Sequence, residues 1–228
     1  MEESSPIAWT TSLLQITLVL LSLFVASVAF SILLAIIGVA DPSFSQLGTW
    51  FSVLLAAYFL RPRSFLSFFG GERSLRMQIA AGSLLGIGLA LLYFAGARLL
   101  CQFGLESPYQ QHVVEYVQQG PIQFALFVIF ANWLCAAVVE ELIFRGFILS
   151  RLTGGRFGVA IPILIQALIF GVVHLPAGLS SAILACVLGL ILGIAFMSFN
   201  KNLTAPIIAH GVANTIIIAG LVVAQTSG

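Results

Sequence analysis

The sequence predicts an all-α, polytopic integral membrane protein with about seven transmembrane helices, within a range of six to eight. Hydrophobic residues make up 60% of the 228 residues, whereas they are about half of an ordinary soluble domain, and the mean hydropathy is +1.12. Charged residues make up 7% and leave long uncharged runs between them. About 20 apolar residues in a helix span the hydrocarbon core while satisfying their own backbone polar groups, which favours helices throughout.

The uncharged runs define the expected helices in chain order. The first lies directly behind the amino-terminal MEESSP, which lacks the basic residues of a signal peptide, and its apolar run continues to Ala40. That run is too long for the core of a signal peptide, so we expect an uncleaved first helix. The second run is short, and the fourth is long because it continues through an acidic pair. The expected spans are approximately 7–36, 44–60, 77–99, 122–149, 157–175, 181–199 and 203–224.

Basic residues alternate between the connections that join these spans. The intervening connections contain no Lys or Arg, although Arg98 lies at the far end of the third span. This alternation predicts a cytoplasmic amino terminus and an external carboxy terminus. The longest polar stretch, 102–120, contains QQHVVEYVQQ, for which we expect a short helix at the outer interface. The basic connections hold Arg61, Arg63, Arg73 and Arg76, then Arg151 and Arg156, then Lys201.

Several classes of partner and site receive no support from the sequence. Cys101, Cys135 and Cys186 lack the spacing of a metal or redox motif and imply no disulfide framework. The net charge is +1, and no block of Lys or Arg with interleaved aromatic residues is present, so we expect no nucleic acid partner. We expect the lipid bilayer as the environment.

Two adjacent acids, Glu140 and Glu141, stand out at the end of the fourth apolar run. A charged side chain at the bilayer centre costs about 3 kcal/mol or more, so intramembrane acids usually face a cavity or a partner and indicate function. On an α-helix, Glu141 and Arg145 are one turn apart and can pair, while Glu140 is turned about 100° away. One acid is then neutralised and the other is left for proton transfer, although an Arg–Glu pair that merely joins helices is the alternative.

Polar residues also occur in the fifth and seventh spans. His174 ends the sequence FGVVH, one helical turn after Phe170, and His210 precedes Asn214 by one turn. Each histidine taken alone is typical of an interhelical hydrogen bond. His112 lies in the polar connector, where we expect a solvated side chain.

Glu140, His174, His210 and Asn214 together suit hydrolysis. The acid can take a proton from water, imidazoles can orient that water, and amide or imidazole donors can stabilise an oxyanion. A Glu with two His also matches a catalytic zinc site, and spacing does not separate the two mechanisms. The HExxH and GxSxG motifs are absent.

Three segments, EELIFR from Glu140, FGVVH from Phe170 and HGVAN from His210, resemble the EExxxR, FxxxH and HxxxN motifs of one family. This is the CAAX protease and bacteriocin-processing family, also called the Abi family, which includes the type II CAAX prenyl proteases. The resemblance covers nearly half of the chain, and the motifs occur in the family's order. It implies a core of about four helices over residues 122–228, preceded by an N-terminal region of about three helices and a connector over residues 1–121.

The resemblance implies an intramembrane endopeptidase. Glu140 would activate the attacking water with help from His174, while His210 and Asn214 would bind the oxyanion. Glu141, Arg145 and Phe170 would hold the shape of the site. The family has been described both as metalloproteases and as glutamate proteases, so the expected cofactor is either none or a divalent metal such as zinc. In the second case the metal ligands would be Glu140, His174 and His210.

The expected substrate is a membrane-associated or lipid-anchored peptide or protein. Relatives act on prenylated proteins, on bacteriocins or on leader peptides, and the resemblance does not separate these. It suggests the plasma membrane of a prokaryote as the location.

The expected depths of the two histidines in the membrane differ, which argues against a shared site. If the fifth span starts at Phe157, His174 lies about 25 Å along its helix, whereas His210 lies about 10 Å from Leu203. Straight helices would keep them apart, and tilt, a deeper start or a kink at Pro162 or Pro206 would bring them together.

Two other functions fit the buried charges. A proton-coupled transporter could relay protons through Glu140 and the histidines, although no internal repeat of the kind common in transporters is visible. A non-catalytic membrane scaffold would need only the acid–Arg pair and would tolerate Glu140→Gln.

Overall fold

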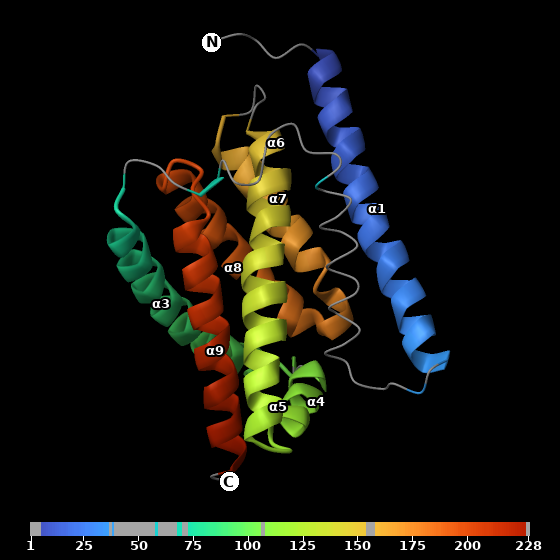
Figure 1. Ribbon diagram of the computed structural model, residues 1–228, viewed down its shortest axis with the longest axis vertical. Helices are drawn as coiled ribbons and strands as arrows, with labels where there is room; N and C mark the ends of the chain where they lie inside the picture. The colour runs from blue at the N-terminus through green and yellow to red at the C-terminus, as the bar shows by residue number, and fades with distance from the viewer. Residues whose placement is uncertain are drawn as a thin grey trace.

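The computed structural model describes residues 6–36, 38, 58, 68–69, 73–105, 108–153 and 158–226. Every element in these ranges is helical (Figure 1). By length and composition, the segments Leu75–Gln102, Pro121–Leu152, Leu179–Ser198 and Thr204–Gln225 are each able to cross a membrane. The prediction of an all-α, polytopic membrane protein is therefore confirmed.

Most predicted spans have a matching helix. The first is α1 (Pro6–Ile36), the third is α3 (Leu75–Gln102), the sixth is α8 (Leu179–Ser198) and the seventh is α9 (Thr204–Thr226). The second predicted span, 44–60, lies outside the described residues apart from Tyr58.

The fifth span was predicted too long. Its helix, α7 (Ala160–Val172), contains 13 residues, shorter than the roughly 20 needed for a full crossing. The chain then enters a short 3-10 turn, η4 (Leu175–Ala177), which contains Pro176. Proline lacks a backbone N–H and disfavours the α conformation in the residue before it, so the helix ends ahead of this turn. His174 consequently follows the helix instead of lying within it.

The fourth span is helical from Pro121 to Leu152, but most of it is not α-helical. It begins as α5 (Pro121–Leu126), continues as the π-helical segments η2 (Phe127–Glu140) and η3 (Leu142–Leu149), and ends as α6 (Ser150–Leu152). The hydrogen bonds of a π-helix join residues five apart, and such segments are rare and frequent at functional sites. The expectation of an ordinary α-helix here is wrong, whereas the expectation of a span is right.

The short helix expected in the polar connector is present as α4 (Pro108–Val117). Val113, Val114 and Val117 are buried against the bundle, while Glu115 is exposed. This apolar face on a polar segment is typical of a helix that lies along a surface. The side chain of His112 is not among those that the structure describes.

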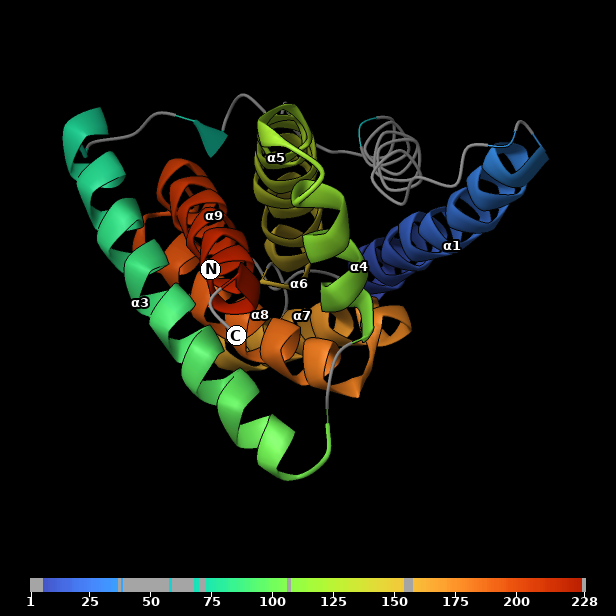
Figure 2. The ribbon, with the colours of Figure 1, turned by 90° about the horizontal axis from the view of Figure 1, so that it is seen from below.

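Glycines let the helices approach closely. A Cβ atom added to Gly82 or Gly86 on α3 would lie 2.7 or 2.6 Å from a backbone carbonyl oxygen of α9, so both positions require glycine. Figure 2 shows α3 and α9 side by side. On the other side, Gly171 on α7 faces the Ala182 carbonyl of α8, and Gly189 on α8 faces Ala167. Such small-residue contacts drive helix association in membranes, where lipid removes the hydrophobic contribution.

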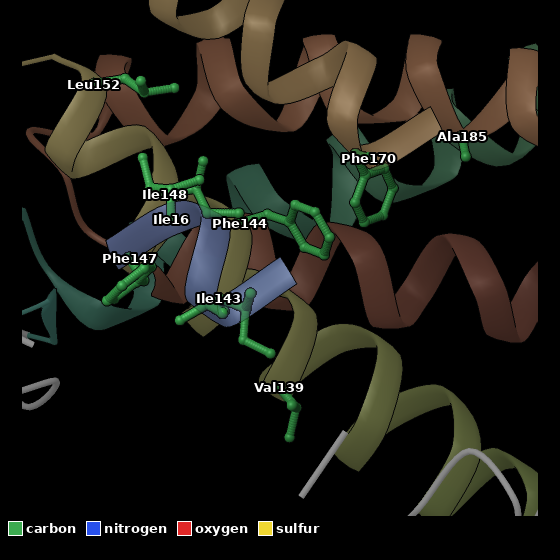
Figure 3. Packing of buried hydrophobic residues seen from close by; sticks show 10 residues of the cluster. Ile16, Val139, Ile143, Phe144, Phe147, Ile148, Leu152, Phe170 and Ala185 are labelled. Atoms are coloured by element: carbon green, nitrogen blue, oxygen red, sulfur yellow. The ribbon is translucent and has the colours of Figure 1, made fainter. Parts of the chain in front are cut away.

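A cluster of apolar side chains joins α1, the continuous helix Pro121–Leu152, α7 and α8 around the acidic pair. Phe144 of η3 packs edge-on against Phe170 of α7, with ring centroids 4.7 Å apart (Figure 3). Ile16 and Val19 of α1 join this cluster. A hydrogen bond of 3.0 Å from Arg151 Nε to Gln15 Oε1 adds a polar contact between α1 and the helix that carries both acids.

Candidate active site

The two adjacent acids occupy different environments. Glu141 is fully buried, and its Oε1 atom accepts a hydrogen bond of 2.8 Å from Arg145 Nη1. Glu140 is 5% exposed and lines a cavity, and its Oε2 atom has no hydrogen-bond partner among the described residues. The predicted pairing of Glu141 with Arg145 is therefore present, and Glu140 points elsewhere.

Arg145 connects three helices. Besides its contact with Glu141, it donates through Nη2 to the Gly189 carbonyl oxygen of α8, at 3.2 Å. Its guanidinium carbon lies 4.8 Å from the centre of the Phe170 ring on α7. A planar fork with several donors suits this combination of carboxylate, carbonyl and aromatic face, and lysine would supply only one point charge.

His210 makes a contact that spacing did not predict. Its Nδ1 atom lies 2.8 Å from Glu141 Oε1, the same oxygen that accepts from Arg145. A carboxylate paired with Arg only accepts hydrogen bonds, so this geometry assigns the proton to Nδ1. In the neutral ring, Nε2 then carries a lone pair. Glu141 thus orients His210 as well as neutralising Arg145.

His174 is oriented in a similar way. Its Nδ1 atom lies 2.7 Å from the Phe170 carbonyl oxygen, one turn earlier, and this contact also assigns the proton to Nδ1. The ring stacks obliquely on Phe170, with centroids 4.7 Å apart. Phe170 thus contacts His174 through both its carbonyl oxygen and its ring, and its role in holding the shape of the site stays a prediction.

Both histidine rings lie close to the Phe170 ring. The Phe170 ring lies 6.2 Å from that of His210 and 4.7 Å from that of His174. The separation in depth that straight helices would give is therefore not present. Of the explanations left open, a deeper start to the fifth span is found, because α7 starts at Ala160 and His174 lies beyond its end.

A cavity of about 990 Å³ brings the predicted site residues together. Its lining includes Glu140, His174, His210 and Asn214, contributed by η2, the end of α7 and α9. Apolar side chains from α1, α3, α4 and α8 form much of the rest of the wall. Few polar groups in a mostly apolar concavity are typical of a small-molecule or peptide site.

Residues 122–216 match the family model described as type II CAAX prenyl endopeptidase Rce1-like. Over this segment, the chain is similar to the Rce1-like family. The resemblance inferred from the sequence motifs is thereby confirmed. Comparisons with curated proteins and with solved structures gave no match.

The Rce1-like segment contains all of the predicted site residues, from Glu140 to Asn214. Similarity to an endopeptidase family, together with several apolar helices, supports an intramembrane endopeptidase in general terms. The roles of the individual residues are not tested by this match and stay predictions.

The described side chains do not form a metal-binding group. Among these residues, no set of three or more His, Cys, Asp and Glu side chains is arranged to hold a metal ion. The lone pairs inferred for both Nε2 atoms suit metal ligation as well as proton transfer, but Glu140, His174 and His210 do not converge as three ligands here. We therefore derive no step through a metal.

Two buried polar side chains escaped the sequence analysis. Asn132 is 5% exposed and lines the cavity, and its Nδ2 donor has no partner among the described residues. Gln166 is fully buried, with neither amide atom hydrogen-bonded in the described part of the chain. Asn132 precedes Glu140 by eight residues, and this spacing, about two helical turns, was the available signal.

Proposed function

We propose that this protein is an intramembrane endopeptidase that hydrolyses a peptide bond in a membrane-associated or lipid-anchored peptide or protein. The observation that carries the proposal is that the two adjacent acids have different partners. Glu141 is held by Arg145 and His210, whereas Glu140 faces a cavity that also contains His174 and Asn214. A carboxylate left available in an apolar pocket is suited to general base catalysis.

In the proposed first step, Glu140 removes a proton from a water molecule in the cavity. His174, oriented by the Phe170 carbonyl, accepts a hydrogen bond from that water through Nε2. The resulting hydroxide attacks the carbonyl carbon of the scissile peptide bond. The carbonyl π electrons move to oxygen and form a tetrahedral oxyanion, for which the Asn214 amide is the proposed donor.

In the second step, the tetrahedral intermediate collapses and the C–N bond breaks. The leaving nitrogen takes up the proton that Glu140 removed from water, so the proton balance closes. His210 bonded to Glu141 resembles the buried carboxylate–imidazole pair of hydrolytic triads, in which the acid orients the ring and stabilises its protonated form. We propose that a protonated His210 keeps its proton and donates a hydrogen bond through Nε2 to the oxyanion.

The cavity supports a peptide substrate that reaches the site within the membrane. We propose that residues 122–228 form the catalytic core and that residues 1–121 complete it, because α1, α3 and α4 each contribute to the cavity wall. CAAX-type cleavage and bacteriocin or leader processing both fit this arrangement. We place the protein in the plasma membrane of a prokaryote.

Comparison of peptide termini in cells tests the proposal. Cells express wild type, Glu140→Gln or the control Glu115→Gln at matched membrane abundance, and mass spectrometry compares their peptide termini. Glu115 is an exposed acid on α4, so its conversion to an amide matches the chemistry of the test variant. New termini with wild type and Glu115→Gln, but not with Glu140→Gln, are expected. Identical termini in all three strains would contradict the proposal, and solute uptake into proteoliposomes would then test the transporter alternative.

A further inference from the structure

The cavity extends far beyond the catalytic acid along two helices that run in opposite directions. On η2, its lining includes Phe127, Asn132, Ala136 and Glu140. On α9, it begins at His210 and continues as far as Leu221. The segment from Phe127 to Glu140 is roughly 20 Å long at an α-helical rise and shorter at a π-helical one. Along these two helices, the lining therefore extends in one direction away from Glu140, and we call this part of the cavity the groove.

Asn132 is a polar residue among the apolar residues of η2 that line the groove before Glu140. The other described lining residues of η2 between Phe127 and Glu140 are alanines. Asn132 is 5% exposed, and its Nδ2 donor has no partner among the described residues. A buried amide donor destabilises a fold unless something accepts its hydrogen bond. Its position on the groove wall makes a bound chain the natural acceptor.

The spacing indicates which part of a substrate Asn132 reaches. Eight residues of helix separate it from Glu140, roughly 10 Å along the groove. An extended peptide advances about 3.3 Å per residue. Asn132 is therefore about three residues away from the bond that Glu140 would attack. Peptide carbonyl groups recur along an extended chain and accept hydrogen bonds from amide donors.

We propose that Asn132 binds a main-chain carbonyl group of the peptide substrate, about three residues from the cleaved bond. This inference rests on the proposed endopeptidase function and adds a binding position to it. Because the contact is with the main chain, it depends on an extended backbone conformation of the substrate and does not select a particular side chain. Uniform binding of substrate and transition state raises KM when it is lost and leaves kcat nearly unchanged.

A nested set of synthetic peptides tests this position. The peptides span the cleavage site identified by the comparison of termini and are shortened by one residue at a time from each end. With wild type, kcat/KM is expected to rise about 3- to 10-fold, through KM, when one end is extended to the third residue. Asn132→Leu, which keeps a similar size without a donor, is expected to lose this rise, so that its kcat/KM no longer depends on the presence of the third residue.

Gln166→Leu is the matched control. Gln166 is another buried amide whose atoms lack partners among the described residues, but it does not line the cavity. It should keep the wild-type dependence on peptide length. An unchanged length dependence in Asn132→Leu, or an equal loss in Gln166→Leu, would overturn the inference. Failure of the proposed function looks different, because wild type would then cleave no peptide or Glu140→Gln would cleave as well as wild type.

Ester substitution in the peptide provides a second test that needs no variant of Asn132. An ester carbonyl is a weaker hydrogen-bond acceptor than an amide carbonyl and its group has no N–H, so replacing single peptide bonds by esters weakens the hydrogen bonds of one peptide group at a time. With the wild-type enzyme, the inference predicts a selective loss of kcat/KM when the third carbonyl from the cleaved bond is changed. An even tolerance of esters at all positions beyond the cleaved bond would overturn it.

Discussion

Glu140 and Glu141 are adjacent in the sequence but lie in different surroundings, which suit different roles. Glu141 accepts hydrogen bonds from Arg145 and His210 on its Oε1 atom, while its Oε2 atom has no partner among the described residues. Glu140 has an oxygen without a partner among the described residues and a cavity in front of it. We therefore expect the same isosteric change to have opposite consequences at the two positions.

Replacing Glu141 by Gln should destabilise the protein, whereas Glu140→Gln should not. Removing one partner of a buried ion pair costs about 3–5 kcal/mol, because the other charge is left uncompensated. Glu140→Gln removes a charge that has no such pair, so its stability should equal or exceed that of wild type. Thermal unfolding of detergent-purified proteins measures the difference. A similar loss of stability in both variants would contradict the division of roles.

The sequence predicted some of these residue contacts and missed others for a physical reason. Glu141 and Arg145 are four residues apart, so helical geometry alone predicts their contact. Glu141 and His210 are 69 residues apart, and their contact depends on how η2 and α9 pack. The His174 ring contacts the Phe170 carbonyl oxygen. Every residue has such a carbonyl, so the sequence does not indicate this contact.

At the scale of elements, Arg145 holds η3 against α8 and α7. Arg145→Lys keeps the charge but loses the fork that reaches Glu141 and the Gly189 carbonyl together. We expect a loss of about 1–3 kcal/mol, the cost of a buried group left without its hydrogen bond. Unfolding of the purified variant measures this loss. Stability equal to that of wild type would show that the contact with α8 contributes little.

The close packing of α3 on α9 gives a second prediction about elements, with a control on the same helix. A Cβ atom at Gly86 would lie 2.6 Å from the Ala209 carbonyl oxygen, whereas at Gly88 it would meet nothing within 4 Å. Gly86→Ala should therefore destabilise the protein by about 1–3 kcal/mol through overpacking. Gly88→Ala should be neutral or slightly stabilising, because alanine favours helix. Equal thermal stability of the two variants would contradict the described packing.

The sequence predicted the presence of most helices but not their hydrogen-bonding type or their length. Uncharged apolar runs predicted α1, α3, α8 and α9 because the bilayer requires such runs. The π-helical hydrogen bonding of η2 and η3 was not predictable, since the apolar pattern does not specify which carbonyl each N–H meets. The short α7 was also missed, because the apolar residues continue past its end.

At the scale of the whole molecule, the three sequence motifs converge on one cavity. Residues far apart in the sequence, from Glu140 to Asn214, line this cavity together with side chains from the N-terminal helices. The motifs predicted residues that line this cavity together, because such polar groups are costly in a membrane unless they face a cavity or a partner. The groove and its far polar residue, Asn132, emerged only from the packing of helices.

The most direct test of the central claim is peptide cleavage by purified protein in proteoliposomes. Wild type and Glu140→Gln are reconstituted at equal density, with thermal unfolding confirming that both are folded, and are supplied with the peptide identified in cells. The account predicts cleavage by wild type and a kcat lower by about 10²- to 10⁴-fold in the variant, the usual contribution of a general base. Cleavage by folded Glu140→Gln at the wild-type rate would contradict it.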